Sequence, residues 1–329
     1  GYQNDEIFME YQHSISDGRG FEEFIRSVLF NYLRRCGHPV ENDGTVRTLD
    51  SFYSVEESED AYQHLKDSYS PEGLYEKPEA LHADSLGDMG GAPEIVTEVT
   101  FPFQALRAVA HQYGVSPLSI ISPLFCRAFY AKFGNGSEKP VLAQIPVDLH
   151  PYVPSVTNRY FICFLDLPYE AAYEQMELPE VFRRTKDFLD AQMQPELLLY
   201  RAKGASDACS EMHMRDIPLE EKEQAARTLV HNFVHADSFL ITNVGQFKLP
   251  ECMRPYVLDY GAVLPSASQP FGMLISSYNG KMKISIAQHD HDMQVCSKFV
   301  QLLGEIGVEA SMGSYPFVVT RFSGREACL

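Results

Sequence analysis

The 329-residue sequence is poor in basic residues. Lys and Arg together number 27 against 45 Asp and Glu, which gives a formal net charge of −18. A surface with this balance repels polyanions, so we expect no nucleic acid among the partners. An anionic co-substrate would need a local group of basic side chains or backbone N–H groups to overcome the same field.

Long hydrophobic runs and paired cysteines are also missing. No apolar stretch approaches the roughly 20 residues that span a bilayer, and the N-terminus lacks a basic segment followed by an apolar one. The seven cysteines are scattered singly, with no CxxC pair. Free thiols of this kind fit a reducing compartment. The sequence therefore predicts a cytoplasmic protein with no membrane partner.

The composition is that of a folded protein, with 45% hydrophobic and 12% aromatic residues. The length predicts two domains or one large two-lobed unit. The hydrophobic pattern weakens over residues 41–93, where acidic clusters, two prolines and a glycine-rich run occur. We therefore divide the chain into residues 1–90 and residues 91–329.

Helical and strand patterns both occur along the chain. Apolar residues follow helical spacing from Phe21 to Leu33, with Gly37 as the expected stop. Further helices are expected at 106–113 with Gly114 as the stop, after Ser116 as the cap and Pro117, around 181–189, after Pro218 and at 293–307. Strands are expected at 7–11, 95–101, 141–147, 161–167, 239–242, 256–264, 273–278, 282–287 and 317–319. Asn279-Gly280 predicts a hairpin turn. This mixture predicts an α/β fold built of sheet and helix layers.

One short motif carries chemistry: His13-x-x-x-Asp17-Gly18. An imidazole gains and loses a proton near neutral pH, which suits the general base of an acyl transfer from a thioester. A glycine permits close backbone approach, and a nearby carboxylate can organise the turn. So short a match also occurs in turns with a solvent-facing histidine. Its place between a predicted strand and an amphipathic helix favours the functional interpretation.

Residues 12–18, Gln-His-Ser-Ile-Ser-Asp-Gly, resemble the HHxxxDG signature of the chloramphenicol-acetyltransferase-like superfamily. That superfamily includes nonribosomal-peptide condensation domains and bacterial alcohol acetyltransferase-like proteins. Residues 145–159 and 241–250 resemble segments of the alcohol acetyltransferase-like members, in the same order and at similar spacing. Three ordered matches are more specific than one.

The resemblance implies a two-lobed fold of mixed β-sheets flanked by helices, with a tunnel between the lobes. His13 would be the general base. Asp17 would hold the loop through an ion pair with an arginine, for which Arg19 or Arg26 is a local substitute, and Gly18 would permit the turn. The implied reaction moves an acyl group from a coenzyme A or carrier-protein thioester to an alcohol, amine or thiol.

Gln12 and Asn243 are the expected substrate-binding residues. Asn243 comes at a strand end beside Gly245, so its amide could face the substrate or instead fix its own backbone. Gln12 stands where the family has its leading histidine. His150 stands where the alcohol acetyltransferase-like members commonly have an arginine.

Two departures from the family shape the functional prediction. In the family a substantial N-terminal segment precedes the motif, whereas here the motif begins at residue 13. We therefore expect an incomplete N-terminal lobe, an acyltransferase in the full-length protein and an inactive fragment. An additional N-terminal segment or self-association would complete the site. The alternative is a non-catalytic condensation-like binding module, which Gln12 and His150 favour.

Residues 288–292, Gln-His-Asp-His-Asp, offer four potential metal ligands in a row. Adjacent residues of a strand point to opposite faces, so they cannot all converge on one ion. A polar turn with Asp292 as a helix cap fits better. We predict no metal, and a metal-dependent hydrolase is the least favoured function.

Overall fold

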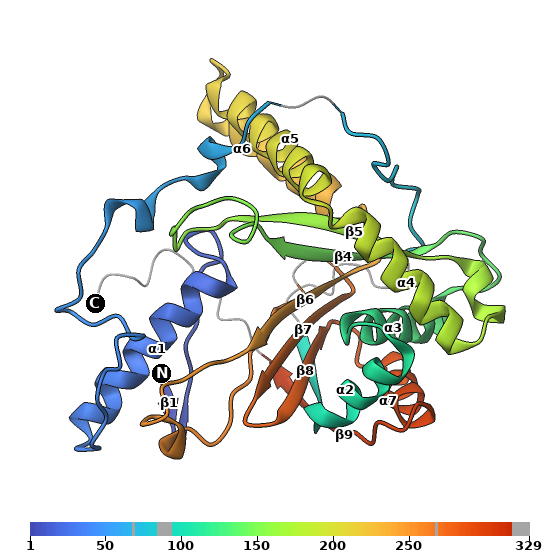
Figure 1. The fold of residues 1–329 in the computed structure, drawn as a ribbon. Helices are drawn as coiled ribbons and strands as arrows, with labels where there is room; N and C mark the ends of the chain where they lie inside the picture. Colours follow the sequence, from blue (N-terminus) through green and yellow to red (C-terminus); the bar gives the residue numbers. More distant parts are fainter. Residues whose placement is uncertain (68–69, 84–93, 267–268, 318–329) are drawn as a thin grey trace.

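The computed structural model describes residues 1–67, 70–83, 94–266 and 269–317. Seven strands of these residues form one mixed sheet in the order β5-β4-β6-β7-β8-β3-β9 (Figure 1). The strands are β3 (Glu94–Pro102), β4 (Val141–Asp148), β5 (Ile162–Tyr169), β6 (Phe239–Gln246), β7 (Phe271–Tyr278), β8 (Lys281–Gln288) and β9 (Ser311–Phe317). The pairs β4–β6 and β6–β7 are parallel and the other pairs antiparallel. The predicted α/β class is confirmed.

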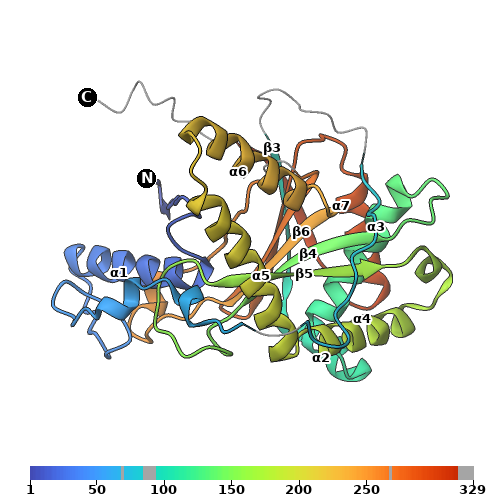
Figure 2. The same cartoon turned by 90° about the horizontal axis from the view of Figure 1, so that it is seen from above.

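Four helices pack together on one side of the sheet: α2 (Phe103–Tyr113), α3 (Leu118–Phe133), α4 (Leu178–Gln192) and α7 (Gln294–Glu305) (Figures 1 and 2). Phe125 of α3 is fully buried and contacts the ring edges of Phe239, Phe271 and Phe299, at centroid separations of 4.9, 5.7 and 5.5 Å. Because T-shaped aromatic contacts add to the burial of apolar area, this cluster joins α3, α7 and the sheet centre into one core.

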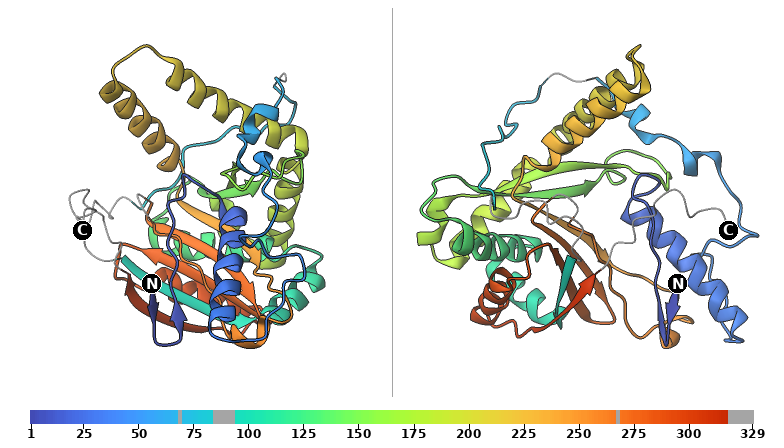
Figure 3. Two further views of the ribbon diagram at one scale, coloured as in Figure 1. Left: turned by 90° about the vertical axis from the view of Figure 1, so that its left-hand side faces the viewer. Right: turned by 180° about the vertical axis from the view of Figure 1, so that it is seen from behind.

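Two further helices form a hairpin that projects from the sheet beside β5, as Figure 3 shows: α5 (Pro195–Met214) and α6 (Leu219–Val234). The ring of Phe233 on α6 meets that of Phe164 on β5 at 5.0 Å. Among the described residues, no helix is both long and apolar enough to cross a membrane.

Helix α1 (Gly18–Arg35) lies away from the other helices, on the opposite side of the sheet (Figure 1). It buries Ile25, Phe30 and Leu33 in a second, smaller core that includes Phe247 and Tyr278. The predicted helix is confirmed, but only part of its apolar stripe is covered. The remaining part faces solvent, with Phe24 56% and Tyr32 51% exposed.

Several local predictions are confirmed by backbone geometry. Asn279 and Gly280 have φ of 47° and 76° and join β7 to β8 as the expected hairpin. Gly114 ends α2 with φ of 66°. Ser116 caps α3, because its Oγ accepts from the N–H of Ser119 at 3.1 Å. Helix α3 continues through Pro123.

Three predicted strands are wrong or misplaced. At 7–11 only Ile7 is in a strand, because β1 (Tyr2–Gln3) pairs with the two residues of β2 (Glu6–Ile7) alone. Residues 256–264 form no strand and belong to none of the paired segments of the sheet. The last strand is β9, which ends at Phe317. Residues 318–319 of the predicted strand lie outside the described residues.

Residues 55–67 and 70–83 follow α1 in the chain and contact β5 and the residues just before β6. They contain two short helices, η1 (Val55–Ser58) and η2 (Ala61–His64). Lys77 bridges the carboxylates of Asp166 on β5 and Asp237 just before β6, at 3.2 and 2.7 Å. The Oγ of buried Ser238 donates to the carbonyl of Leu81 at 2.6 Å. These contacts hold residues 70–83 against β5 and the start of β6.

Candidate functional site

His13 lies in the turn just before α1, with its side chain exposed. Its ring lies between those of Tyr11 and Tyr160, each at a centroid separation of 5.6 Å. Tyr11 in turn stacks on Phe21 of α1 at 3.7 Å. The imidazole is therefore held by aromatic neighbours while it stays accessible to an incoming molecule.

The two tyrosines remain neutral phenols over the physiological range. Burial, with the nearby negative charge of Asp17, raises the pKa of Tyr11 to about 12. The same causes raise the pKa of Tyr160, which is more deeply buried. Each hydroxyl beside His13 can therefore donate a hydrogen bond as well as accept one.

Asp17 is buried and joins two distant parts of the chain. Its Oδ1 accepts from the N–H of Gly20 at 3.0 Å, which makes it the N-cap of α1. Its Oδ2 accepts from the N–H of Phe161 at 3.1 Å, immediately before β5. One carboxylate thus satisfies backbone donors from a helix start and a strand start.

The expected ion pair between Asp17 and an arginine is not formed within the described part of the chain. Arg26 pairs with Glu23 on its own helix, and the charge of Arg19 acts on Asp148 and His150. The backbone N–H groups of Gly20 and Phe161 bind the Asp17 carboxylate instead. Asp17 therefore joins the start of α1 to the start of β5 through backbone hydrogen bonds.

Two glycines bring the motif close to its neighbours. A Cβ on Gly18 would lie 3.2 Å from Cγ1 of Val244 on β6. A Cβ on Gly20 would overlap the carbonyl oxygen of Asn158 and the Oγ of Ser16. Ser16 itself donates to that carbonyl at 2.7 Å. Gly18 is the first residue of α1, and Gly20 is the residue whose lack of a side chain the packing requires.

The expected substrate-binding residues are both exposed at the surface. Gln12 is adjacent to His13 in the turn. Asn243 uses its Oδ1 to accept from the N–H of Gly245 at 2.9 Å, where β6 has a bulge and Gly245 has φ of 79°. The alternative in which this side chain fixes its own backbone therefore accounts for the oxygen, and only the Nδ2 group is left to contact a substrate.

The histidine-rich run 288–292 forms a polar turn before α7. Lys132 binds the carboxylates of Asp290 and Asp292 at 2.9 and 3.1 Å. Asp292 also accepts from the N–H of Gln294, the first residue of α7, at 2.9 Å. Within the ranges that the structure describes, no group of three His, Cys, Asp or Glu side chains is placed to hold a metal ion.

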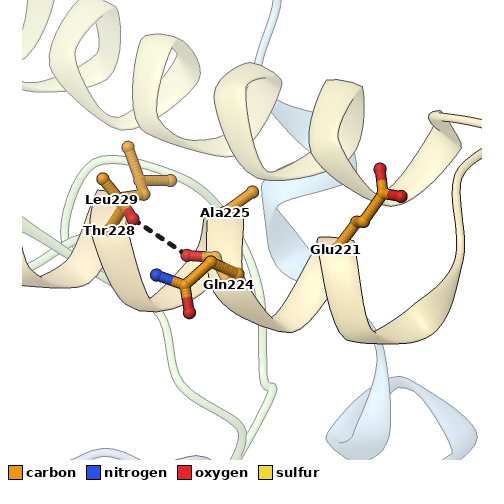
Figure 4. Close-up of a pocket in the computed structure, with 5 residues that line it drawn as sticks. All are labelled: Glu221, Gln224, Ala225, Thr228 and Leu229. Carbon is orange, nitrogen blue, oxygen red and sulfur yellow. Dashed lines mark hydrogen bonds between the residues drawn. The ribbon is translucent and has the colours of Figure 1, made fainter.

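Two surface hollows do not include the motif. One, of about 520 Å³, lies along α6, where it is lined by Glu221, Gln224, Ala225, Thr228 and Leu229 (Figure 4). The Thr228 hydroxyl there donates to the carbonyl of Gln224. The other, of about 420 Å³, lies on the exposed side of α1. Neither is lined by His13, Asp17 or Asn243.

Replacing Asp17 tests its double role. Asp17→Ala removes both acceptors, and we expect the free energy of unfolding to fall by about 2–3 kcal/mol in urea denaturation, because a helix cap and a charge-assisted bond are lost together. Asp17→Asn is the matched variant, since it keeps one oxygen for Gly20 and turns an amide nitrogen toward Phe161. Faster hydrogen exchange at Phe161 than at Gly20 is expected there, and equal changes at both would contradict the assignment.

The structure adds residues that sequence reasoning missed. Tyr11, Tyr160, Gly20 and the Phe161 backbone all shape the site. Gly20 follows the motif by two residues, and Tyr160 directly follows the Asn158-Arg159 pair that supported the resemblance. Their adjacency to matched segments was the available signal, but only the fold brings residues 11–20 and 158–161 together.

Comparisons with known proteins agree on the fold. No family model matches the chain, and no curated protein matches its sequence. Among solved structures, TRI101 of F. sporotrichioides, complexed with coenzyme A and T-2, is 15% identical with a TM-score of 0.56, covering 92% of this chain and 65% of its own. Polyketide synthase associated protein 5 from Mycobacterium tuberculosis is 13% identical with a TM-score of 0.50, covering 88% and 71%.

Two further solved structures are similar to this chain. The epimerization domain from the third module of tyrocidine synthetase B is 13% identical with a TM-score of 0.50, covering 89% of this chain and 67% of its own. This chain spans about half, 48%, of the wax ester synthase/diacylglycerol acyltransferase from Marinobacter aquaeolei VT8, with a TM-score of 0.41. The similarity to TRI101, polyketide synthase associated protein 5 and the epimerization domain shows a shared fold, which agrees with the fold that the resemblance implied.

Proposed function

We propose that the full-length protein is an acyltransferase that uses His13 as its general base. The acyl donor is a coenzyme A or carrier-protein thioester, and the acceptor is an alcohol, amine or thiol. The observation that carries the proposal is the exposed His13 imidazole beside Asp17, whose carboxylate is fixed from two sides at 3.0 and 3.1 Å in a fold of the acyltransferase type. Coenzyme A in the TRI101 complex supports the choice of donor.

In the proposed reaction His13 takes the proton of the acceptor as the acceptor atom attacks the thioester carbonyl. The carbon–sulfur bond then breaks, and the departing thiolate receives the proton from the imidazolium. Every proton and electron pair is accounted for in these two steps, so the proposed reaction requires no metal ion or redox cofactor. The Nδ2 group of Asn243 and the amide of Gln12 are proposed to contact the substrate.

Thiol release tests this function directly. The full-length protein is incubated with acetyl-CoA and longer acyl-CoAs and a panel of alcohols and amines, and free thiol is measured with a chromogenic disulfide. For thiol acceptors, which consume one thiol for each one released, the acylated product is measured by mass spectrometry instead. We expect acceptor-dependent release that His13→Ala abolishes. Coenzyme A binding without turnover with any acceptor would instead support the non-catalytic binding module, which Gln12 favours.

We also propose that the surface of residues 1–55 is covered in the functional assembly, by a second copy or by further polypeptide. Half of the exposed large hydrophobic side chains of the described residues lie in this first part of the chain, among them Phe8, Ile15, Phe24, Leu49 and Phe52. On the exposed side of α1, Phe24, Val28 and Tyr32 line one hollow together, and grouped exposed apolar side chains mark interaction sites. We propose the domain division into residues 1–90 and 91–329 together with this covered surface. Light scattering of the purified 329-residue chain should show a mass above that of one chain if the cover is a second copy.

A cytoplasmic location is part of the same proposal. Cys126, Cys163 and Cys296 are free and buried. Burial raises the pKa of Cys296 to about 12. Thiols of this kind are small core side chains, and a reducing compartment preserves them.

A further inference from the structure

His150 lies in the polypeptide turn that leaves β4, with its side chain only 3% exposed. Its Nδ1 contacts Oδ1 of Asp148 at 2.5 Å, and its Nε2 contacts the carbonyl oxygen of Thr157 at 3.0 Å. The ring edge also meets Phe161 at a centroid separation of 5.4 Å. Both ring nitrogens are therefore engaged in a nearly closed environment.

The two partners decide the protonation state. A carboxylate and a backbone carbonyl are acceptors, so each needs a hydrogen on the nitrogen that faces it. A neutral imidazole carries one such hydrogen, whereas the imidazolium carries two. Only the cation satisfies both contacts, because a neutral ring would set an unprotonated nitrogen against one of the two acceptor oxygens.

We infer that His150 is a cationic positioning residue that clamps Asp148 at the end of β4 to Thr157, and so holds the loop that binds the carboxylate of Asp17. The inference deepens the proposed function, because it concerns the support of the same site. His150 does not touch the reacting groups.

The clamped loop reaches the motif through short contacts. Thr157 also donates its hydroxyl to the carbonyl of Glu59 at 2.8 Å. One residue later, the Asn158 carbonyl accepts from Ser16, and the N–H of Phe161 donates to Asp17. A displacement of Thr157 is therefore passed within four residues to the atoms that fix the turn of His13.

The charges around the ring favour the cation on balance. Burial acts to lower the pKa of His150, but the hydrogen bonds to Asp148 and Thr157 and the charge of Asp148 outweigh burial and leave this pKa raised. Arg19, on α1, is the other charged group facing the ring and acts in the opposite direction. The pKa of Asp148 is correspondingly lowered, since burial is outweighed by its bonds to His150.

The sign of the pH effect follows. A histidine whose pKa is raised in the folded chain stabilises the loop fully below about pH 6.5, the ordinary value, and loses that contribution as the pH rises through the raised pKa. The clamp is therefore expected to loosen on the alkaline side. Loss of the clamp should then appear at Phe161, whose N–H depends on the loop position.

Nitrogen NMR of the 329-residue chain labelled with ¹⁵N-histidine tests the charge without any activity measurement. The His150 signals are assigned by their absence in His150→Gln. We expect both ring nitrogens to carry a proton at pH 6.5, with a titration midpoint above about 6.5. A single-proton, neutral tautomer at that pH would overturn the inference, whatever the outcome of the thiol-release assay.

Hydrogen exchange at the Phe161 amide tests the positioning role. After correction for the intrinsic pH dependence of exchange, protection in the unmodified chain should fall as His150 loses its proton. His150→Gln should exchange about tenfold faster near neutral pH, the effect of losing a bond to a charged group. His150→Arg should restore protection and remove its pH dependence.

The exposed His111 on α2 provides the control. His111→Gln should leave the Phe161 amide unchanged at every pH. If His150→Gln has no more effect than His111→Gln, or if His150→Arg keeps the pH dependence, His150 is not the clamp. Because exchange is read in the folded chain, this failure remains distinguishable from an absence of acyl transfer.

Discussion

His13→Ala is expected to lower kcat/KM for thiol release by the full-length protein by about 10²–10⁴-fold, the usual contribution of a general base. The loss should lie mostly in kcat, because the imidazole acts as the proton moves and not as the substrate binds. Stability should hardly change, since the side chain is exposed and its contacts are with the rings of Tyr11 and Tyr160. Steady-state rates over a range of acceptor concentrations measure the effect.

Two variants serve as controls for this experiment. His111→Ala removes an exposed histidine from α2 and should retain the full rate. His13→Gln keeps a polar side chain that cannot accept and return a proton, so it should be as slow as alanine. Residual activity of His13→Gln near that of the unmodified protein would show that another group is the base.

Gly20→Ala is expected to have the largest effect on stability of any single methyl group added near the site. The new Cβ would overlap the carbonyl oxygen of Asn158 and the Oγ of Ser16, and it would lie 2.9 Å from the Asn158 carbonyl carbon. Either the loop or the start of α1 must move, and the bonds made by Asp17 move with it. We expect unfolding in urea to require about 3 kcal/mol less, at the upper end of overpacking costs.

Gly204→Ala is the matched comparison for Gly20. Gly204 lies within α5, where a Cβ would meet nothing within 4 Å. Alanine is the better helix former, so this variant should gain about 0.5–1 kcal/mol. A change from glycine to alanine is thus expected to lower the free energy of unfolding in α1 and to raise it in α5. A neutral or stabilising Gly20→Ala would contradict the close approach of α1 to the Asn158 loop.

Periodic patterns predicted the regular elements because those patterns arise from the helix and the strand themselves. The Asn279-Gly280 hairpin and the Gly114 stop depend only on local backbone angles, so the sequence was sufficient for both. For α1 the apolar spacing indicated the helix but not which part would be covered. Phe30 is buried and Phe24 is exposed, because the partner surface formed by Phe247 and Tyr278 meets one side only.

The wrong strands have a different origin. A strand needs an edge to pair with, and alternation in sequence carries no information about free edges. In residues 256–264 the chain instead passes Tyr260 over Phe247, with ring centroids 4.1 Å apart, and Leu258 is left 76% exposed.

The candidate site could be predicted only in its contiguous part. His13, Asp17 and Gly18 were found because they lie within six residues of one another. The partners that fix Asp17 and surround His13 come from residues 158–161, and the cation that supports that loop is His150. The resemblance implied an arginine as the partner of Asp17, whereas the backbone N–H groups that bind its carboxylate leave no mark in a sequence.

The bond from Phe161 to Asp17 joins residues 144 positions apart. During synthesis, Asp17 cannot accept this hydrogen bond until the loop of residues 149–161 and β5 have been made. The pairing of β4 with β6 needs another 70 or so residues. Because contacts between distant residues form slowly, the turn of His13 should be among the last features to reach its final geometry. Before this bond forms, the nascent chain would expose α1, including Phe24 and Tyr32, to molecular chaperones.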